Sequence, residues 1–248
     1  RKASWKNFRR NFVVPLTIGL ATGGILFMLG VREFIPLIFF CSCGFVTATM
    51  VYEFYKGARA RQTIRPSGFL VALTDLTLMN KRRYGGFIIH VGAVLVFAGI
   101  VGSSFFKSEG LFTVVAGEEF TLGDYTCRFL DITSRSDPEK DVVSARLEIL
   151  KGGVSKGQLT PEKHFHHKNE QPMTEVKIYS TLMEDLYVVL SGWDDQQRVT
   201  FNVFVNPMVQ WIWIGIGVMV LGGVFVLLPN KKIVVLKRSM QEVGDEGA

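Results

Sequence analysis

The sequence predicts an α-helical integral membrane protein with four transmembrane helices and an extracytoplasmic β-rich domain. Hydrophobic residues make up 48% of the 248 residues, and they are concentrated in uncharged runs. Each run is close to the roughly 20 residues that a helix needs to cross a bilayer. None shows the charged face expected of a water-soluble helix. The runs are 12–31, 34–52, 86–106 and 208–229.

These runs divide the chain into three parts. Residues 1–106 are expected to hold a basic head, three transmembrane helices and a cytoplasmic amphipathic connection. In that connection, apolar residues recur every three or four positions between Phe69 and Met79, which favours a helix lying at the membrane interface. Residues 207–248 are expected to hold the fourth transmembrane helix and a cytoplasmic tail.

The middle part, residues 107–206, has a different pattern. Apolar and polar residues alternate from Ala145 to Ile149 and from Val199 to Val205, as in half-buried strands. We expect a small β sandwich or barrel of about 100 residues. Residues 134–141, SRSDPEKD, are expected to form a flexible excursion from it.

The charge distribution predicts the topology. Residues 107–206 contain 11 Lys and Arg against 16 Asp and Glu, although the whole chain has a net charge of +6. The basic residues therefore gather in the head, in residues 56–83 and in the tail. The positive-inside rule places these segments and both termini in the cytoplasm, and residues 107–206 outside. The positive charge indicates contact with the lipid bilayer and no role in nucleic-acid binding.

His90 is the main candidate for a functional residue. It is the one ionisable residue well inside a predicted span, where polar groups are costly and usually face the bundle interior or a cavity. Imidazole is also the common protein ligand of haem iron. The alternatives are a proton relay and a histidine hydrogen-bonded to a neighbouring helix. Gly85, Gly86 and Gly92 would let a flat macrocycle or another helix approach.

Outside the predicted spans, His164, His166 and His167 form a second cluster. His164 and His166 would share one face of a strand and could hold one ion, but no third ligand is evident. We therefore expect a surface loop or an edge strand. Cys127 is alone in its domain, so it can form no disulfide there.

The sequence indicates no catalytic residue. It contains no GxSxG, P-loop, HExxH or CxxC motif, and no GxGxxG after a strand. The carboxylates of residues 107–206 follow no paired pattern and are interpreted as a solvated face. These observations leave binding and transport functions open.

Three stretches, taken in order, resemble the C-terminal part of CcmF, the membrane subunit of bacterial cytochrome c maturation that acts in haem ligation. The first is an Arg-Tyr-Gly turn that leads into a span with a histidine a few residues in. The second lies in the β-rich segment and the third at the last span. They read NKRRYGGFIIHVG from Asn80; LTPEK from Leu159, QPMTEV from Gln171 and EDLYV from Glu184; and NPMVQWIWIG from Asn206, with Gly222 and Gly223.

This resemblance implies that His90 is an axial ligand of the iron of a resident haem b in a bacterial inner membrane. That haem would support reduction of the delivered haem, which is attached to the CxxCH cysteines of apocytochrome c. The implied partners are apocytochrome c, a thioreduction subunit and a haem chaperone, with residues 107–206 in the periplasm. No role for His164, His166 or His167 follows from the resemblance.

The chain also departs from the family. The tryptophan-rich outer motif, the outer histidines near it and the second histidine of the resident haem are missing. We therefore expect a C-terminal fragment or a separately encoded half, which is not catalytic alone and needs the N-terminal portion as partner. Two other functions stay open. Half of a transporter would use His90 as a proton relay and contain broken helices, whereas a scaffold displaying a β domain would tolerate loss of His90.

Overall fold

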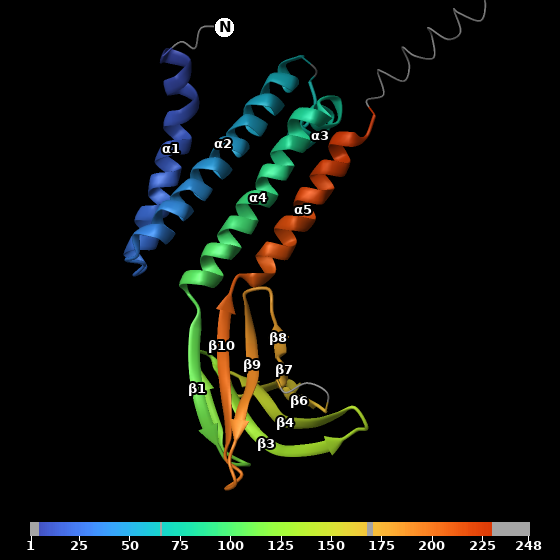
Figure 1. Cartoon of the computed structure of the whole chain (residues 1–248). Helices are drawn as coiled ribbons and strands as arrows, with labels where there is room; N and C mark the ends of the chain where they lie inside the picture. Colours follow the sequence, from blue (N-terminus) through green and yellow to red (C-terminus); the bar gives the residue numbers. More distant parts are fainter. Residues whose placement is uncertain (1–4, 65, 168–170, 230–248) are drawn as a thin grey trace, which may run out of the picture. The chain divides into compact units, whose positions relative to one another are not determined.

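The computed structural model describes residues 5–64, 66–167 and 171–229 (Figure 1). The chain divides into two compact units. One contains residues 1–98 and 211–248 and is helical where it is described; the other contains residues 99–210 and is mainly β. The predicted fold class, membrane helices with a β-rich domain, is confirmed.

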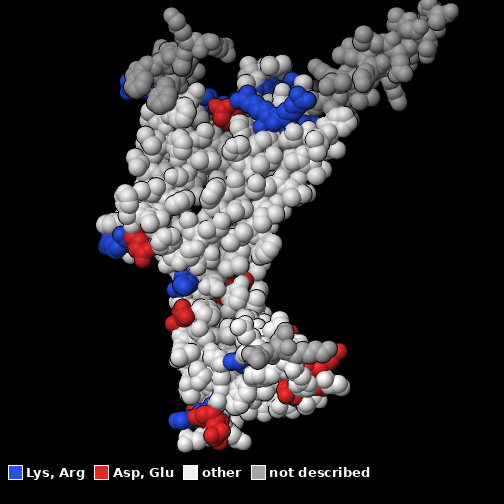
Figure 2. Space-filling view, in the orientation of Figure 1, with Lys and Arg blue, Asp and Glu red and all other residues white. Residues whose placement is uncertain are grey.

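Four of the five described helices are long and apolar enough to cross a membrane. In Figure 2 they form a band without charged side chains, as the uncharged runs require. The fifth helix, α3, is the predicted amphipathic segment. The helices are α1 (Trp5–Met28), α2 (Phe34–Ile64), α3 (Phe69–Met79), α4 (Lys81–Phe105) and α5 (Val209–Leu227).

Helix α2 is longer than its apolar run. It continues past Tyr52 to Ile64, because residues 53–64 contain no proline and Pro66 follows just after its end. A residue that precedes proline is disfavoured in the helical conformation, which stops the helix there. The extension carries basic side chains beyond the apolar part of the helix.

Contacts among the helices bring the predicted basic connections to one end of the helical unit. The ammonium group of Lys56 donates to Asn11, 2.6 Å away, and the guanidinium of Arg83 lies 2.6 Å from the carboxylate of Glu53. Lys81 donates to the carbonyl oxygen of Pro229 at 3.1 Å. The ends of α2 and α5 and the starts of α1 and α4 are therefore neighbours. The basic residues predicted at 1–4 and 231–238 lie outside the described part of the chain.

The β unit is built from two antiparallel sheets. One has the order β1-β10-β9-β8; the other has the order β2-β3-β4-β6-β7, with β5 paired to β4. The strands are β1 (Ser108–Val114), β2 (Glu119–Leu122), β3 (Tyr125–Ser136), β4 (Lys140–Lys151), β5 (Val154–Leu159), β6 (Glu162–His166), β7 (Met173–Glu175), β8 (Lys177–Ser180), β9 (Glu184–Trp193) and β10 (Val199–Pro207).

The core of the β unit lies between the inner faces of these sheets. Alternate residues of β10, from Val199 to Val205, are buried, as the period-two pattern predicts. Phe201 packs against Phe120 and Phe129, with ring centroids 5.9 and 5.5 Å apart, so one aromatic cluster joins the two sheets. The predicted excursion at 134–141 is a hairpin, because β3 and β4 stay paired as far as Ser136 and Asp141.

Helices α4 and α5 pack through glycines. A Cβ atom added to Gly92 would lie 2.5 Å from the carbonyl oxygen of Gly215, and one added to Gly215 would lie 2.6 Å from that of Gly92. Two turns along, a Cβ on Gly85 would lie 2.5 Å from Val226, and one on Gly222 would lie 2.9 Å from Ile89. The two backbones thus touch almost directly, as small residues allow in membranes.

The substitution Gly92→Ala is expected to destabilise the helical unit by about 1–3 kcal/mol, because the new methyl group has no room beside α5. Thermal unfolding of the detergent-purified full chain would measure this loss. Gly217→Ala, on α5, is the control: nothing lies within 4 Å of its added Cβ. Equal destabilisation by both substitutions would contradict the close glycine contact.

Candidate functional site

His90 lies on α4 with its two ring nitrogens in different environments. Its Nδ1 is 2.7 Å from the carbonyl oxygen of Gly86, one turn earlier. A carbonyl oxygen can only accept, so Nδ1 carries the proton and donates it. In the neutral ring, Nε2 is then the nitrogen with a free lone pair. The side chain is exposed, so this nitrogen is accessible from outside the described helices.

The packing of α4 determines which face carries His90. One face holds Gly85 and Gly92 against α5, and a second packs Tyr84 and Phe87 against Phe54 of α2. At about 100° per residue, His90 lies roughly 140° around the helix from Gly85. It therefore lies on a face that neither α5 nor α2 covers.

The three glycines around His90 have different roles. Gly85 and Gly92 are explained by close packing, whereas a Cβ added to Gly86 would meet nothing within 4 Å. Gly86 lies on the His90 face, one turn before the histidine, and with no side chain it leaves the helix surface beside the imidazole open. Helix packing, one of the two explanations that the sequence left open, therefore accounts for Gly85 and Gly92.

The glycines of α1 give no support to a broken helix. Helix α1 is continuous from Trp5 to Met28. A Cβ on Gly19 would lie 2.8 Å from the carbonyl oxygen of Cys41, and one on Gly23 would overlap the sulfur of Cys41. These glycines serve the contact between α1 and α2, and the half-buried Cys41 is part of that contact.

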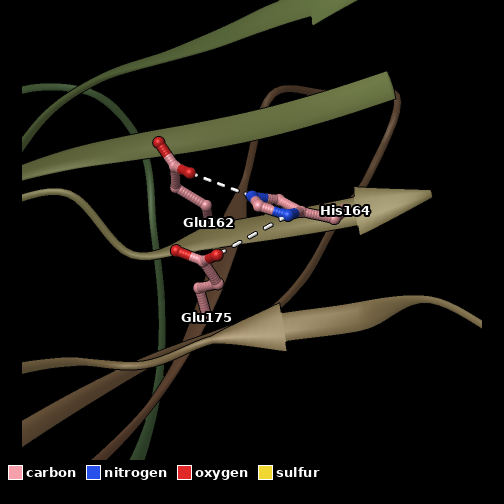
Figure 3. Close-up of side chains that lie close together, drawn as sticks. All are labelled: Glu162, His164 and Glu175. Carbon is pink, nitrogen blue, oxygen red and sulfur yellow. Dashed lines mark hydrogen bonds and ion pairs between the residues drawn. The ribbon is translucent and has the colours of Figure 1, made fainter. Parts of the chain in front are cut away.

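The second histidine cluster is arranged differently from its prediction. Strand β6 lies between β4 and β7, so it is not an edge strand, and His164 is buried with 6% of its surface exposed. Figure 3 shows it between Glu162 and Glu175, which approach different ring nitrogens. The third ligand-type residue, Glu175, comes from β7 through pairing that the sequence pattern does not specify.

The hydrogen bonds of His164 occupy both of its nitrogens. Lys140 Nζ lies 3.2 Å from Nδ1 and can only donate, so Nδ1 accepts. Nε2 therefore carries the proton and donates to Glu162 at 3.0 Å. This hydrogen bond, with that from Ser144, holds the pKa of Glu162 below its usual range. The cluster is a hydrogen-bonded network, and both ring nitrogens of His164 are occupied while Lys140 stays in place.

The other two histidines do not join this network. His166 lies on the same face of β6, with its ring centroid 6.5 Å from that of His164. His167 lies 3.4 Å from the carboxylate of Asp141 and 3.2 Å from the carbonyl oxygen of Pro138.

The β unit is similar to a domain of known family. Residues 105–207 match the family model described as the CcmF C-terminal beta-sandwich. This chain is similar to the CcmF family of cytochrome c-type biogenesis proteins. It corresponds to the C-terminal part of such a protein, as the three sequence stretches predicted.

Curated relatives extend the match beyond the β unit. The cytochrome c-type biogenesis protein CcmF of Haemophilus influenzae is 28% identical over 181 residues, which cover 73% of this chain and 27% of the relative. The probable cytochrome c-type biogenesis protein NrfE of Escherichia coli is 30% identical over 160 residues, covering 62% and 28%. The chain thus spans little more than a quarter of the length of these CcmF-family relatives.

A solved structure shares the fold. The chain named cytochrome c heme lyase CcmF matches 92% of this chain with a TM-score of 0.70, at 18% sequence identity. The match covers 36% of that structure. The fold is therefore shared although little of the sequence is.

The substitution His164→Ala is expected to loosen β6 and β7, because Lys140 and Glu162 each lose a buried partner. A loss of about 1–3 kcal/mol would speed amide exchange in these strands roughly tenfold or more. Hydrogen exchange followed by mass spectrometry on the full chain would measure it. His166→Ala should leave exchange unchanged; the same acceleration in both would refute the specific role of His164.

Cys127 is expected to be inert in the folded chain. Burial among core side chains raises the pKa of its thiol to about 12, so at pH 8 only on the order of one thiol in 10⁴ is ionised. Iodoacetamide at pH 8 should alkylate it only after denaturant is added, as peptide mass spectrometry would show. Rapid alkylation of the folded protein would disprove this.

Proposed function

We propose that this chain provides His90 as one axial ligand of a haem b in a membrane-bound cytochrome c haem lyase. The observation that carries the proposal is the hydrogen bond from His90 Nδ1 to the carbonyl oxygen of Gly86, which leaves Nε2 as an outward-facing acceptor. Iron-ligating histidines commonly donate their second N–H to a carbonyl or carboxylate in this way.

The surroundings of His90 fit a flat ligand. Gly86 lies one turn before His90 and Ala93 one turn after it. Only small residues therefore flank the imidazole ring along the helix. Phe97, two turns along the same face, is half-exposed and adds an apolar surface. Such a surface would accept a macrocycle, and its apolar side chains would add contacts to the ring.

Each residue of the site then has a defined task. The Gly86 carbonyl fixes the tautomer and orientation of the imidazole and increases the basicity of Nε2. Gly85 and Gly92 hold α4 against α5, which keeps His90 on the open face. When bound, the haem iron supplies the one-electron chemistry that reduces the delivered haem.

The rest of the assembly follows from the family relationship. The second axial ligand would come from the N-terminal portion of the protein or from a separate subunit, so this chain is not catalytic alone. The β unit would lie in the periplasm of a bacterial inner membrane, because the basic segments predict a cytoplasmic side for the other loops. There it would dock apocytochrome c, whose CxxCH cysteines receive haem, or the thioreduction subunit and haem chaperone.

Co-expression of this chain with its N-terminal portion, followed by dithionite reduction of the purified complex, tests the proposal. The wild type is expected to show a b-type α band that His90→Ala abolishes, because no other described side chain on α4 replaces the ligand. Cytochrome c maturation in the co-expressing cells should fall with it. The absorption spectrum gives the ligand result independently of activity.

Two controls make the experiment decisive. His164→Ala removes a histidine outside the helical unit and should leave the band intact. Gel filtration shows whether each variant still assembles. A well-assembled wild type without a band, or a band that survives His90→Ala, would refute haem ligation by His90 and favour a scaffold role.

A further inference from the structure

A cavity lies at the basic end of the helical unit, where α2, α3 and α4 meet. Its volume is about 280 Å³. Two arginines contribute to its wall, Arg61 from α2 and Arg83 from α4, together with the amide of Asn80 at the end of α3. Figure 2 shows the Lys and Arg side chains gathered at this end of the unit.

Arg61 has hydrogen-bonding capacity that the described residues do not use. Its Nε is buried and has no hydrogen-bond partner among the described part of the chain. The nearest opposite charge, Asp75, is 3.9 Å from one of the terminal nitrogens and does not line the cavity. A buried guanidinium N–H without an acceptor is unfavourable, and an anion in the cavity would satisfy it.

The other polar groups also have donors to spare. Arg83 uses one nitrogen on Glu53, and a guanidinium carries five N–H groups. Asn80 donates one amide hydrogen to the carbonyl oxygen of Leu76, 3.2 Å away, which leaves the second. The cavity wall therefore offers cationic and neutral donors and includes no carboxylate among its lining residues.

The rest of the wall is apolar. Ile64, Leu76 and Met79 line the cavity, and Ile64 and Met79 are exposed beside it. Gly57 forms a close contact there: a Cβ on it would lie 2.5 Å from the Tyr84 hydroxyl and 2.6 Å from Leu76. Donors for an anion thus lie next to a surface suited to hydrocarbon, at the ends of membrane-spanning helices.

We propose that this cavity binds the phosphate group of an anionic phospholipid. Arg61 and Arg83 hold the phosphate oxygens through charge-assisted hydrogen bonds, and Asn80 adds a neutral one. The first acyl carbons lie along Ile64 and Met79. A free phosphate would use the same donors but gain nothing from the apolar wall. Basic pockets between helices at a membrane surface are suited to lipid headgroups. This site is independent of His90.

Native mass spectrometry of the detergent-purified full chain tests the site. Dioleoyl phosphatidylglycerol is titrated against wild type, Arg61→Gln and Arg83→Gln. Each substitution is expected to weaken binding about tenfold, the effect of losing a charge-assisted hydrogen bond. Dioleoyl phosphatidylcholine, with the same acyl chains and no net charge, should bind more weakly than phosphatidylglycerol to the wild type.

Arg59→Gln is the matched control. Arg59 lies on the same end of α2 but does not line the cavity; it is exposed and donates to the Tyr55 hydroxyl. Its loss should change binding less than twofold. Equal weakening by Arg59→Gln and Arg61→Gln would show diffuse attraction and overturn the proposal, as would unchanged binding in both cavity variants.

Two further arms separate the remaining outcomes. If millimolar inorganic phosphate displaces the lipid from the wild type, the cavity is a free-anion site and the lipid proposal fails. Arg61→Lys keeps the charge but removes Nε, so it should bind between the wild type and Arg61→Gln. This variant keeps the test decisive if Arg61→Gln elutes as aggregate in gel filtration.

Discussion

The arrangement of the helical unit depends on the direct contact between the backbones of α4 and α5. Gly92 and Gly215 approach so closely that either Cβ would collide with the carbonyl oxygen opposite. In a membrane there is no hydrophobic gain from helix association, so close packing of this kind is a main source of stability. It fixes the rotation of α4, and through that rotation it decides that His90 faces outward while Gly85 and Gly92 are covered.

Adjacent residues of α4 therefore meet opposite requirements. Gly85 must be small because α5 packs against it, whereas a Cβ added to Gly86 would have no neighbour within 4 Å. The carbonyl of Gly86 holds the imidazole of His90, so the helix backbone itself orients the side chain. Orientation by a main-chain group does not depend on a second side chain that substitution could remove.

The sequence predicts the membrane helices well, because a bilayer requires long uncharged runs whatever their neighbours. It also locates β4 and β10 through their alternation. The sequence predicts less about the contacts that arise from strand pairing. The burial of His164 and its approach to Glu175 depend on β6 lying between β4 and β7, and strand order is not encoded in local pattern. Glu162, two residues before His164 on the same strand face, was a signal that could have been used.

His90 is a similar case. Its position in a span identifies it as a candidate. That its Nε2 has a free lone pair follows from the hydrogen bond between Nδ1 and the Gly86 carbonyl oxygen, which the three-dimensional structure shows. Gly85 and Gly92 can be distinguished from Gly86 only when the position of α5 is known, because the first two contact α5 and Gly86 does not. The extension of α2 is not apparent from hydropathy, because residues 53–64 are polar although they contain no proline.

Helix α5 has 19 described residues, about 28 Å of helix, which nearly equals a hydrocarbon core of roughly 30 Å. Helix α2, with 31 residues, has length to spare, but α5 has none for tilting without drawing its ends into hydrocarbon. Because α4 is bound to α5 through the glycines, the thickness of the surrounding bilayer acts on both. A thicker membrane has to thin around this pair, at a fraction of a kcal/mol per Å. Lipid chain length is thus a variable that tunes the stability of this protein without any change in its sequence.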